Sequence, residues 1–195
     1  HELKTPLTVI RGYSEMLESK PEKVHEYSSR INSESIRMAN IIDKLLKIAA
    51  LDEGRATESV ELDLAEYLQK YVNDFKVLEP LRPVELSANT LKITAPYDLI
   101  DTLISNLISN VRIHTPIDAP LRITLKDKNL IIEDGGPGLT VIPDKPFQRF
   151  DKSRSRASGG SGLGMSLIQK SAKQLGAKLE FGRSDLGGLK VSITF

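Results

Sequence analysis

A histidine and a carboxylate stand next to each other at the start of the chain, as His1 and Glu2. A neutral imidazole nitrogen can attack a phosphoryl group near pH 7, and an adjacent carboxylate can hold the proton on the other ring nitrogen. The apolar residues Leu3 and Leu7 fit heptad positions d and a, which places Thr5 at f, His1 at b and Glu2 at c. We therefore expect these three polar residues on the outward face of a helix, where successive protein partners can reach the histidine.

A second group of polar residues and glycines lies far downstream. Asn106 and Asn110 are four residues apart, so on a helix they share a face, and amide oxygens are hard ligands that suit Mg²⁺. Asp134 ends an apolar segment and is followed by Gly136 and Gly138. Glycines let the backbone approach a planar base closely. A carboxylate there can accept a hydrogen bond from the exocyclic amine of adenine, which would select adenine over guanine.

A third motif, Gly160-Ser-Gly-Leu-Gly164, has glycines at 160, 162 and 164 and precedes an expected helix. Backbone amides at the start of a helix bind phosphate, so we expect Gly160, Gly162 and Gly164 at a phosphate site. The motif is not a Walker A loop, because no Gly-Lys-Ser/Thr follows. Four basic residues before it are candidates for phosphate contacts when a lid closes: Arg149, Lys152, Arg154 and Arg156. For the last two, a solvated charge run is an equally good interpretation.

The spacing of apolar residues predicts the elements that position these groups. Residues 1–54 read as two short helices with a break at Lys20-Pro21-Glu22, and Pro6 is expected to bend the first helix. Helices with such broad apolar faces are not stable alone, so we expect a second copy to pair with them in a four-helix bundle. Residues 55–59 read as a linker. Residues 60–195 mix helices and strands and predict an α+β layer.

Within the second region we expect strands at 60–62, 84–87, 91–94, 122–126, 130–133, 178–181 and 189–194. We expect helices at 64–75, 97–113 and 165–175, the last stopped by Gly176. Residues 139–160 have little periodicity and are expected to form a mobile loop.

Composition excludes several classes of function. Lys and Arg number 27 against 26 Asp and Glu, for a net charge of +1, so nucleic acid is not expected as a partner. The absence of cysteine excludes disulfides and thiolate metal sites. No run of roughly 18 apolar residues is present, so we expect no membrane contact from this region. Because the chain begins at His1, inside an expected helix, we expect a longer protein with a sensing segment upstream.

Taken together, these motifs resemble the sensor histidine kinases of two-component systems. The resemblance implies a multi-domain fold: an all-α helical hairpin that forms a dimeric four-helix bundle, followed by an α+β two-layer sandwich of the GHKL ATPase type. The hairpin, residues 1–54, would be the HisKA-type dimerisation and phosphotransfer domain, and residues 60–195 the ATP-binding domain. ATP and Mg²⁺ are the implied cofactors. Asn110 matches the metal-binding asparagine, with Asn106 close by, and His114 stands where a ring stacks on adenine.

The resemblance also implies the activity. His1 would be autophosphorylated and would pass its phosphoryl group to an aspartate in the receiver domain of a response regulator. The residue at the position of Thr5 helps to orient water for dephosphorylation of that partner. The kinase would act as a homodimer through the hairpin. This region is expected on the cytoplasmic side of a full-length protein anchored in the cell membrane.

The chain departs from the family pattern near the end of the expected long helix. Ile113 stands where a basic residue is usual, Arg112 is one position away, and Pro96 stands where an aspartate is frequent. These departures keep open a degenerate dimeric scaffold that binds nucleotide or regulator without kinase activity. A second alternative is another GHKL-type ATPase, of the gyrase, mismatch-repair or chaperone kind. Those enzymes use a glutamate on the long helix, where this chain has Asn106.

Overall fold

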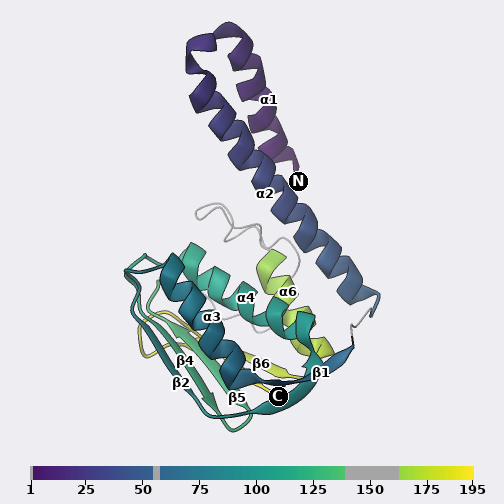
Figure 1. Cartoon of the computed structure of the whole chain (residues 1–195), viewed down its shortest axis with the longest axis vertical. Helices are drawn as coiled ribbons and strands as arrows, with labels where there is room; N and C mark the ends of the chain where they lie inside the picture. The colour runs from purple at the N-terminus through teal and green to yellow at the C-terminus, as the bar shows by residue number, and fades with distance from the viewer. Residues whose placement is uncertain (1, 55–57, 139–162) are drawn as a thin grey trace. The chain divides into compact units, whose positions relative to one another are not determined.

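The computed structural model describes residues 2–54, 58–138 and 163–195. The chain divides into two compact units, residues 1–49 and residues 50–195. The first contains a helical hairpin, and the second contains a sheet with helices (Figure 1).

The hairpin consists of α1 (Lys4–Ser19) and α2 (Val24–Asp52), joined by the short 3₁₀ helix η1 (Pro21–Lys23). The break falls where the sequence predicts it. The backbone N–H of Lys20 caps α1 by donating to the carbonyl of Met16 at 2.9 Å, and Pro21 then starts the turn. The rings of Tyr13 and Tyr27 pack across the hairpin with centroids 5.5 Å apart. The expectation of two short helices is wrong for α2, which has 29 residues.

The hairpin buries only part of its apolar stripe. On α2, the residues Tyr27, Ile41 and Ile48 are buried, whereas Leu46 is 63% exposed. On α1, Leu7 is 55% exposed although it fits a heptad seam position. One hairpin therefore leaves apolar area that a second helical surface can cover.

Pro6 lies near the start of the described helix. Because α1 begins at Lys4, Pro6 lies buried in its first turn. A proline in the first turn removes no helical hydrogen bond, since the first N–H groups of a helix have no partner within it. The bend expected at Pro6 stays a prediction.

The second unit is built on a five-stranded sheet with the strand order β2-β4-β5-β7-β6. β2 pairs with β4 in parallel, and all other neighbours are antiparallel. A separate two-stranded antiparallel sheet joins β1 and β3. The strands are β1 (Ser59–Asp63), β2 (Val84–Ala88), β3 (Lys92–Pro96), β4 (Leu121–Lys126), β5 (Asn129–Asp134), β6 (Lys178–Arg183) and β7 (Leu189–Thr194).

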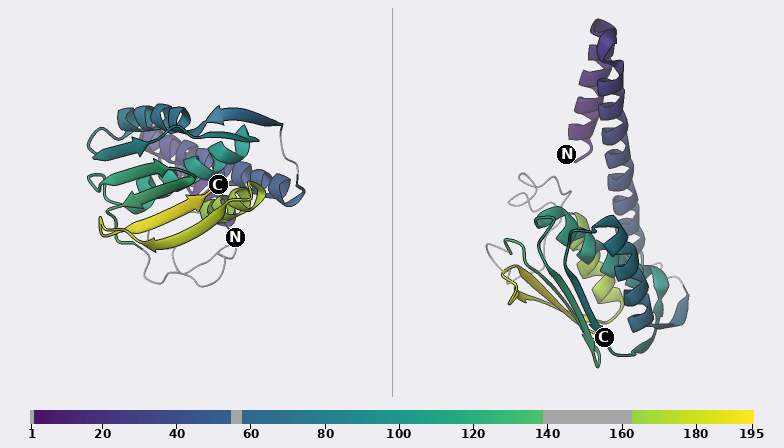
Figure 2. Two further views of the ribbon diagram at one scale, coloured as in Figure 1. Left: turned by 90° about the horizontal axis from the view of Figure 1, so that it is seen from below. Right: turned by 60° about the vertical axis from the view of Figure 1, so that its left-hand side comes forward.

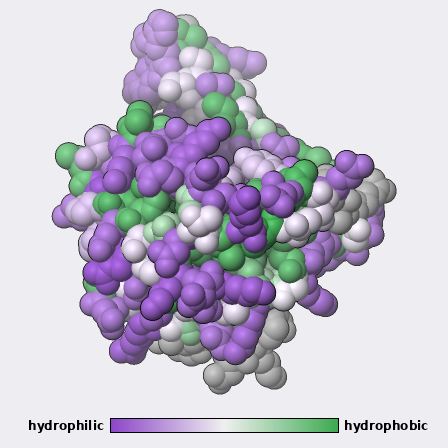
Figure 3. Space-filling view, turned by 60° about the horizontal axis from the view of Figure 1, so that its bottom comes forward, coloured by the Kyte–Doolittle hydropathy of each residue, from purple (hydrophilic) through white to green (hydrophobic). Residues whose placement is uncertain are grey.

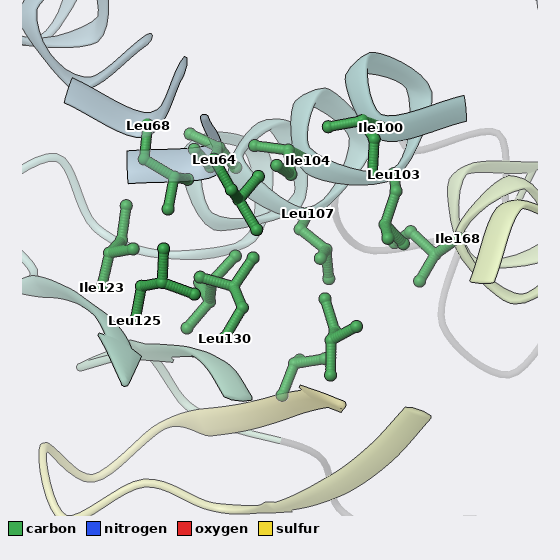
Figure 4. Close-up of a cluster of buried hydrophobic side chains, with 14 of the residues drawn as sticks. Leu64, Leu68, Ile100, Leu103, Ile104, Leu107, Ile123, Leu125, Leu130 and Ile168 are labelled. Atoms are coloured by element: carbon green, nitrogen blue, oxygen red, sulfur yellow. The ribbon is translucent and has the colours of Figure 1, made fainter. Parts of the chain in front are cut away.

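Three helices, α3 (Leu64–Leu78), α4 (Tyr97–His114) and α6 (Leu163–Gln174), lie on one face of the larger sheet (Figures 1 and 2). The core lies between the two layers (Figure 4). Its fully buried side chains include Leu64, Leu68, Ile100, Leu103, Ile104, Ile123, Leu125, Leu130 and Ile168. This arrangement confirms the expected helical region followed by a two-layer α+β sandwich.

The ends of several elements differ from those expected. α3 continues for a turn beyond Phe75 to Leu78. Val77 is 80% exposed and Leu78 68% exposed, so this last turn carries no buried periodicity that the sequence could reveal. At its start, α3 is capped by Asp63, whose Oδ1 accepts from the N–H of Ala65 at 2.9 Å. α6 ends just before Gly176, which adopts φ +67°, as expected for a glycine stop.

The face of the molecule in Figure 3 is covered mainly by hydrophilic residues, with hydrophobic residues scattered among them. Among the helices of the described residues, none combines the length and the apolar character needed to span a bilayer.

Candidate functional site

Asn106 and Asn110 meet the start of α6. Asn106 is buried, and its Nδ2 donates to the carbonyl of Thr102 at 2.7 Å, which fixes the orientation of its amide. A Cβ added to Gly164 would lie 3.2 Å from Asn110 Oδ1 and 3.5 Å from Asn106 Oδ1. Both amide oxygens therefore face the first turn of α6. We call Asn106, Asn110 and Gly164 the phosphate site.

The chemistry of the phosphate site suits a Mg²⁺-bound phosphate chain. The first N–H groups of α6 lack partners within the helix and carry the positive end of its dipole, which favours anions. Mg²⁺ takes one or two hard oxygen ligands from a protein and the rest from phosphates and water. Within the described ranges, no cluster of three His, Cys, Asp or Glu could hold a metal by itself. The two asparagine oxygens therefore suit a Mg²⁺ ion whose other ligands are oxygens of phosphate and water.

Asp134 is held by the backbone around it. It is 6% exposed, and its Oδ1 accepts from the N–H of Gly136 at 2.8 Å and from the N–H of Leu189 at 3.2 Å. Its own carbonyl accepts from the N–H of Gly188 at 3.0 Å. Within the described residues, both side-chain hydrogen bonds go to Oδ1, so Oδ2 can accept a hydrogen bond from a ligand. A carboxylate fixed in this way is suited to an exocyclic amine.

The glycines near Asp134 are required by close contacts. A Cβ on Gly136 would lie 2.4 Å from Thr115 Cγ2, and one on Gly188 would lie 2.0 Å from Asp134 Oδ1. Gly138 adopts φ +66°, which a side chain rarely tolerates. With glycine at 136 and 188, the backbone at these positions can lie close to the Asp134 carboxylate.

His114 is the last residue of α4 and precedes Thr115. Burial lowers the pKa of His114, and the nearby charge of Asp134 raises it by a smaller amount. The imidazole is therefore mainly neutral at pH 7, as a ring that stacks on a base should be. We call Asp134, Gly136 and His114 the adenine site.

Arg112 and Ile113 are the two departures from the family pattern next to His114. Arg112 points to Glu79, with 3.3 Å between Arg112 Nε and Glu79 Oε1, so it is already engaged in an ion pair. Ile113 is 44% exposed. In the described part of the chain, neither residue supplies an unpaired basic group next to His114.

The remaining candidates lie in the hairpin or outside the described residues. Thr5 is exposed on α1, and Glu2 just before α1 is half-buried. His1, Arg149, Gly160 and Gly162 lie outside the described residues. So do the basic residues at 152, 154 and 156 and the loop expected at 139–160.

Sequence reasoning missed Thr115. Its Oγ1 donates to the carbonyl of Val111 at 2.7 Å, and its methyl group fills the space that a side chain on Gly136 would need. A threonine just before Pro116, at the end of a predicted helix, was the available signal, because short hydroxyl side chains cap and close such ends.

Comparisons with known proteins agree with this geometry. Residues 1–54 match the model of the His Kinase A (phospho-acceptor) domain. Residues 96–195, just over half of the chain, match the model of the histidine kinase-, DNA gyrase B-, and HSP90-like ATPases.

Among individual proteins, the chain is 32% identical to the probable sensor histidine kinase TcrY of Mycobacterium tuberculosis H37Rv, over 89% of this chain and 39% of that protein. It is 29% identical to the sensor protein QseC of Escherichia coli K12, over 100% of this chain and 45% of that protein. The chain thus spans less than half the length of these curated relatives.

Solved structures show the same fold. The histidine kinase AdeS of Acinetobacter baumannii aligns with a TM-score of 0.75 at 19% identity, over 100% of this chain and 96% of that one. The cytoplasmic segment of the histidine kinase QseC aligns with a TM-score of 0.57 at 24% identity, over 82% of this chain and 92% of that one. With a phospho-acceptor match ahead of an ATPase match, and with 32% identity to a sensor histidine kinase over 89% of its length, the chain belongs to the sensor histidine kinases.

Proposed function

We propose that this chain is the ATP-dependent core of a protein-histidine kinase that autophosphorylates His1 and passes the phosphoryl group to an aspartate of a response regulator. The observation that carries the proposal is the combination in one chain of a phospho-acceptor match that begins at His1 and an ATPase match with a backbone-held Asp134. Gyrase-like and chaperone-like ATPases do not need a histidine-bearing hairpin.

The adenine site would select and orient the base. Asp134 Oδ2 accepts a hydrogen bond from the exocyclic amine, and Gly136 lets the ring approach the backbone. His114, neutral at pH 7, stacks on the base through its ring face. Because Oδ1 of Asp134 is fixed by two N–H groups, the carboxylate does not have to reorganise when adenine binds.

The phosphate site would position the triphosphate. Asn110 would hold Mg²⁺ through its amide oxygen, with Asn106 close to the same site, while the N–H groups at the start of α6 bind phosphate oxygens. When bound, Mg²⁺ neutralises the charge of the phosphates. Arg149, Gly160 and Gly162 are proposed to add phosphate contacts from the segment outside the described residues.

In the transfer step, a ring nitrogen of His1 forms a bond to the γ-phosphorus, and the bond from that phosphorus to the bridging oxygen breaks, so that ADP leaves. Glu2 holds the proton on the other ring nitrogen and stabilises the charged ring. The receiver aspartate then attacks the same phosphorus, and the P–N bond breaks to return His1. Thr5, which is exposed on α1 and follows His1 by four residues in the sequence, is proposed to orient water when the kinase dephosphorylates its regulator.

The apolar stripe of the hairpin supports a homodimer through residues 1–54. Residues 55–59 would then act as the linker to the ATP-binding domain at 60–195. The curated relatives are longer than this chain, and we propose that the full-length protein is anchored in the cell membrane with this region in the cytoplasm.

The test is incubation of the protein with γ-labelled ATP and Mg²⁺. We expect label that is stable in base and lost in acid, abolished by His1→Gln and by Asn110→Ala, and retained by the matched control His25→Gln. Label that persists in His1→Gln contradicts the proposal. Steady ATP hydrolysis that is insensitive to His1→Gln would identify an ordinary ATPase, and ADP binding without any label would identify a scaffold.

A further inference from the structure

Arg82 is a buried cation that the nucleotide chemistry does not use. It lies between α3 and β2, is 4% exposed as a residue, and its side chain is completely buried. Burial of a guanidinium group is costly unless strong hydrogen bonds compensate for it. Its position therefore needs an explanation.

The side-chain hydrogen bonds of Arg82 go to one segment, residues 115–120, which joins α4 to β4. A single nitrogen, Nη1, donates to Thr115 Oγ1 at 2.7 Å and to the carbonyl of Ala119 at 2.9 Å. The two acceptors lie near the two ends of the segment, so the Arg82 guanidinium links its start to its end. In the described residues, Arg82 Nε and Nη2 have no hydrogen-bond partner, so the side-chain hydrogen bonds of Arg82 all come from Nη1.

The segment that Arg82 holds forms a wall of the adenine site. The N–H of Gly135 donates to the carbonyl of Pro120 at 2.9 Å. A Cβ on Gly135 would lie 2.6 Å from Pro120 Cδ, and one on Gly136 would lie 2.4 Å from Thr115 Cγ2. The backbone after Asp134 thus packs directly on the segment that Arg82 ties down. His114 precedes the same segment.

Glu79 balances the charge of Arg82. Its Oε2 lies 3.9 Å from Arg82 Nη2, and its Oε1 lies 3.3 Å from Arg112 Nε. Arg112 is 57% exposed and, among the described residues, makes no hydrogen bond to residues 115–120, whereas the side chain of Arg82 is fully buried and donates to two of them. Glu79 thus pairs with both Arg82 and Arg112. In the described residues, Arg82 is the one that hydrogen-bonds to the wall of the adenine site.

We propose that Arg82 is a positioning residue for adenine, which acts through Thr115 and Ala119 to fix the distance between His114 and the Asp134–Gly136 backbone. The inference rests on the proposed nucleotide-binding function. Arg82 itself does not touch the base. Its effect is on the affinity and selectivity for adenine, because both are set by the position of the wall.

The test measures ADP and GDP affinity of the whole chain by titration calorimetry in Arg82→Met, Thr115→Val and the double variant. We expect each single change to weaken ADP binding about tenfold, since a buried hydrogen bond to a charged group is lost in each. We expect the ratio of ADP to GDP affinity to fall as well. Both variants break the contact between Arg82 and Thr115. We therefore expect the ADP affinity of the double variant to be no more than about twofold below that of the single variant that binds ADP less tightly.

Arg112→Met is the matched control, because it removes the other arginine on Glu79 and leaves the wall intact. It should bind ADP as the unchanged chain does. Unchanged ADP affinity in Arg82→Met, or effects that add in the double variant, would overturn the inference. Equal loss of ADP and GDP would indicate a merely structural role and would also overturn it.

Hydrogen exchange without nucleotide separates this inference from the proposed function. In Arg82→Met the amides of Gly135 and Gly136 should exchange faster than in Arg112→Met, whether or not the protein binds ADP. Unchanged exchange at these two amides contradicts the inference even if the kinase is active. If Arg82→Met does not fold, Thr115→Val carries the same test, because it removes the acceptor and keeps the shape of the side chain.

Discussion

Gly188 lies closer to Asp134 than any side chain would allow. A Cβ at this position would be 2.0 Å from Asp134 Oδ1, 2.5 Å from the carbonyl oxygen of Asp134 and 2.6 Å from the N–H nitrogen of Gly136. Two of these three atoms belong to the backbone, so rotation of a flexible side chain cannot relieve the contact. Gly188→Ala must therefore move the Asp134 carboxylate or the backbone next to it.

The losses of stability and of ADP affinity in Gly188→Ala can be estimated from the contacts that the added methyl group disturbs. Overpacking of this kind costs about 1–3 kcal/mol of stability. For a unit of this size, that corresponds to a fall in melting temperature of about 3–10 °C. Displacement of Asp134 also loses a hydrogen bond to a charged acceptor, about 1.5–3 kcal/mol, which predicts a fall in ADP affinity of about ten- to a hundredfold.

Calorimetric titration with ADP and thermal unfolding by circular dichroism measure the two effects. Gly182→Ala is the matched control, because Gly182 lies in β6 with no atom within 4 Å of an added Cβ. We expect it to leave both quantities unchanged. If Gly188→Ala binds ADP within about twofold of the unchanged chain, the role given to the Asp134 backbone contacts is wrong.

Three further changes test the local physics. Asp63→Ala removes the cap that accepts from the N–H of Ala65 at 2.9 Å, so denaturant unfolding should show a loss of about 1 kcal/mol that Asp63→Asn largely restores; equal losses in both variants would contradict this. Gly12→Ala, in the interior of α1 with open space around it, should raise the stability of the hairpin by about 1 kcal/mol, and an unchanged melting curve would contradict the helical placement. Burial lowers the folded pKa of His114 below its ordinary 6.5, so the unfolded state binds more protons as the pH falls through that range and stability decreases there. His114→Gln should flatten this acid-side decline in urea unfolding measured between about pH 8 and about pH 5, and an identical decline would show that His114 is not its source.

Elements with a buried periodic face were predictable from the sequence. α4 was expected at 97–113 and is observed at Tyr97–His114, because residues on its inner face are almost fully buried, among them Leu103 and Ile104. The last turn of α3 was missed because Val77 and Leu78 face solvent.

The same division holds for the candidate site. Asn106 and Asn110 share a helix face by spacing alone, and a strand that ends in Asp134 before glycines is a local signal. Thr115 and Arg82 depend on contacts between segments 33 residues apart in the sequence. No periodicity encodes such contacts, because they arise only when α3, α4 and β4 pack together. Functional residues that share one helix or strand can therefore be predicted from the sequence. Contacts between elements, such as that of Arg82 with Thr115, are found only in the structure.

The central claim is that ATP phosphorylates His1. The chain has three histidines, and His25 and His114 serve as internal alternatives to His1. The most direct measurement is tandem mass spectrometry of the protein after incubation with Mg²⁺ and ATP, with digestion kept alkaline to preserve phosphohistidine. The account predicts the phosphoryl group on the peptide that contains His1 and none on the other two histidines. A phosphoryl group on His25 or His114, or only on a hydroxyl side chain, would contradict it.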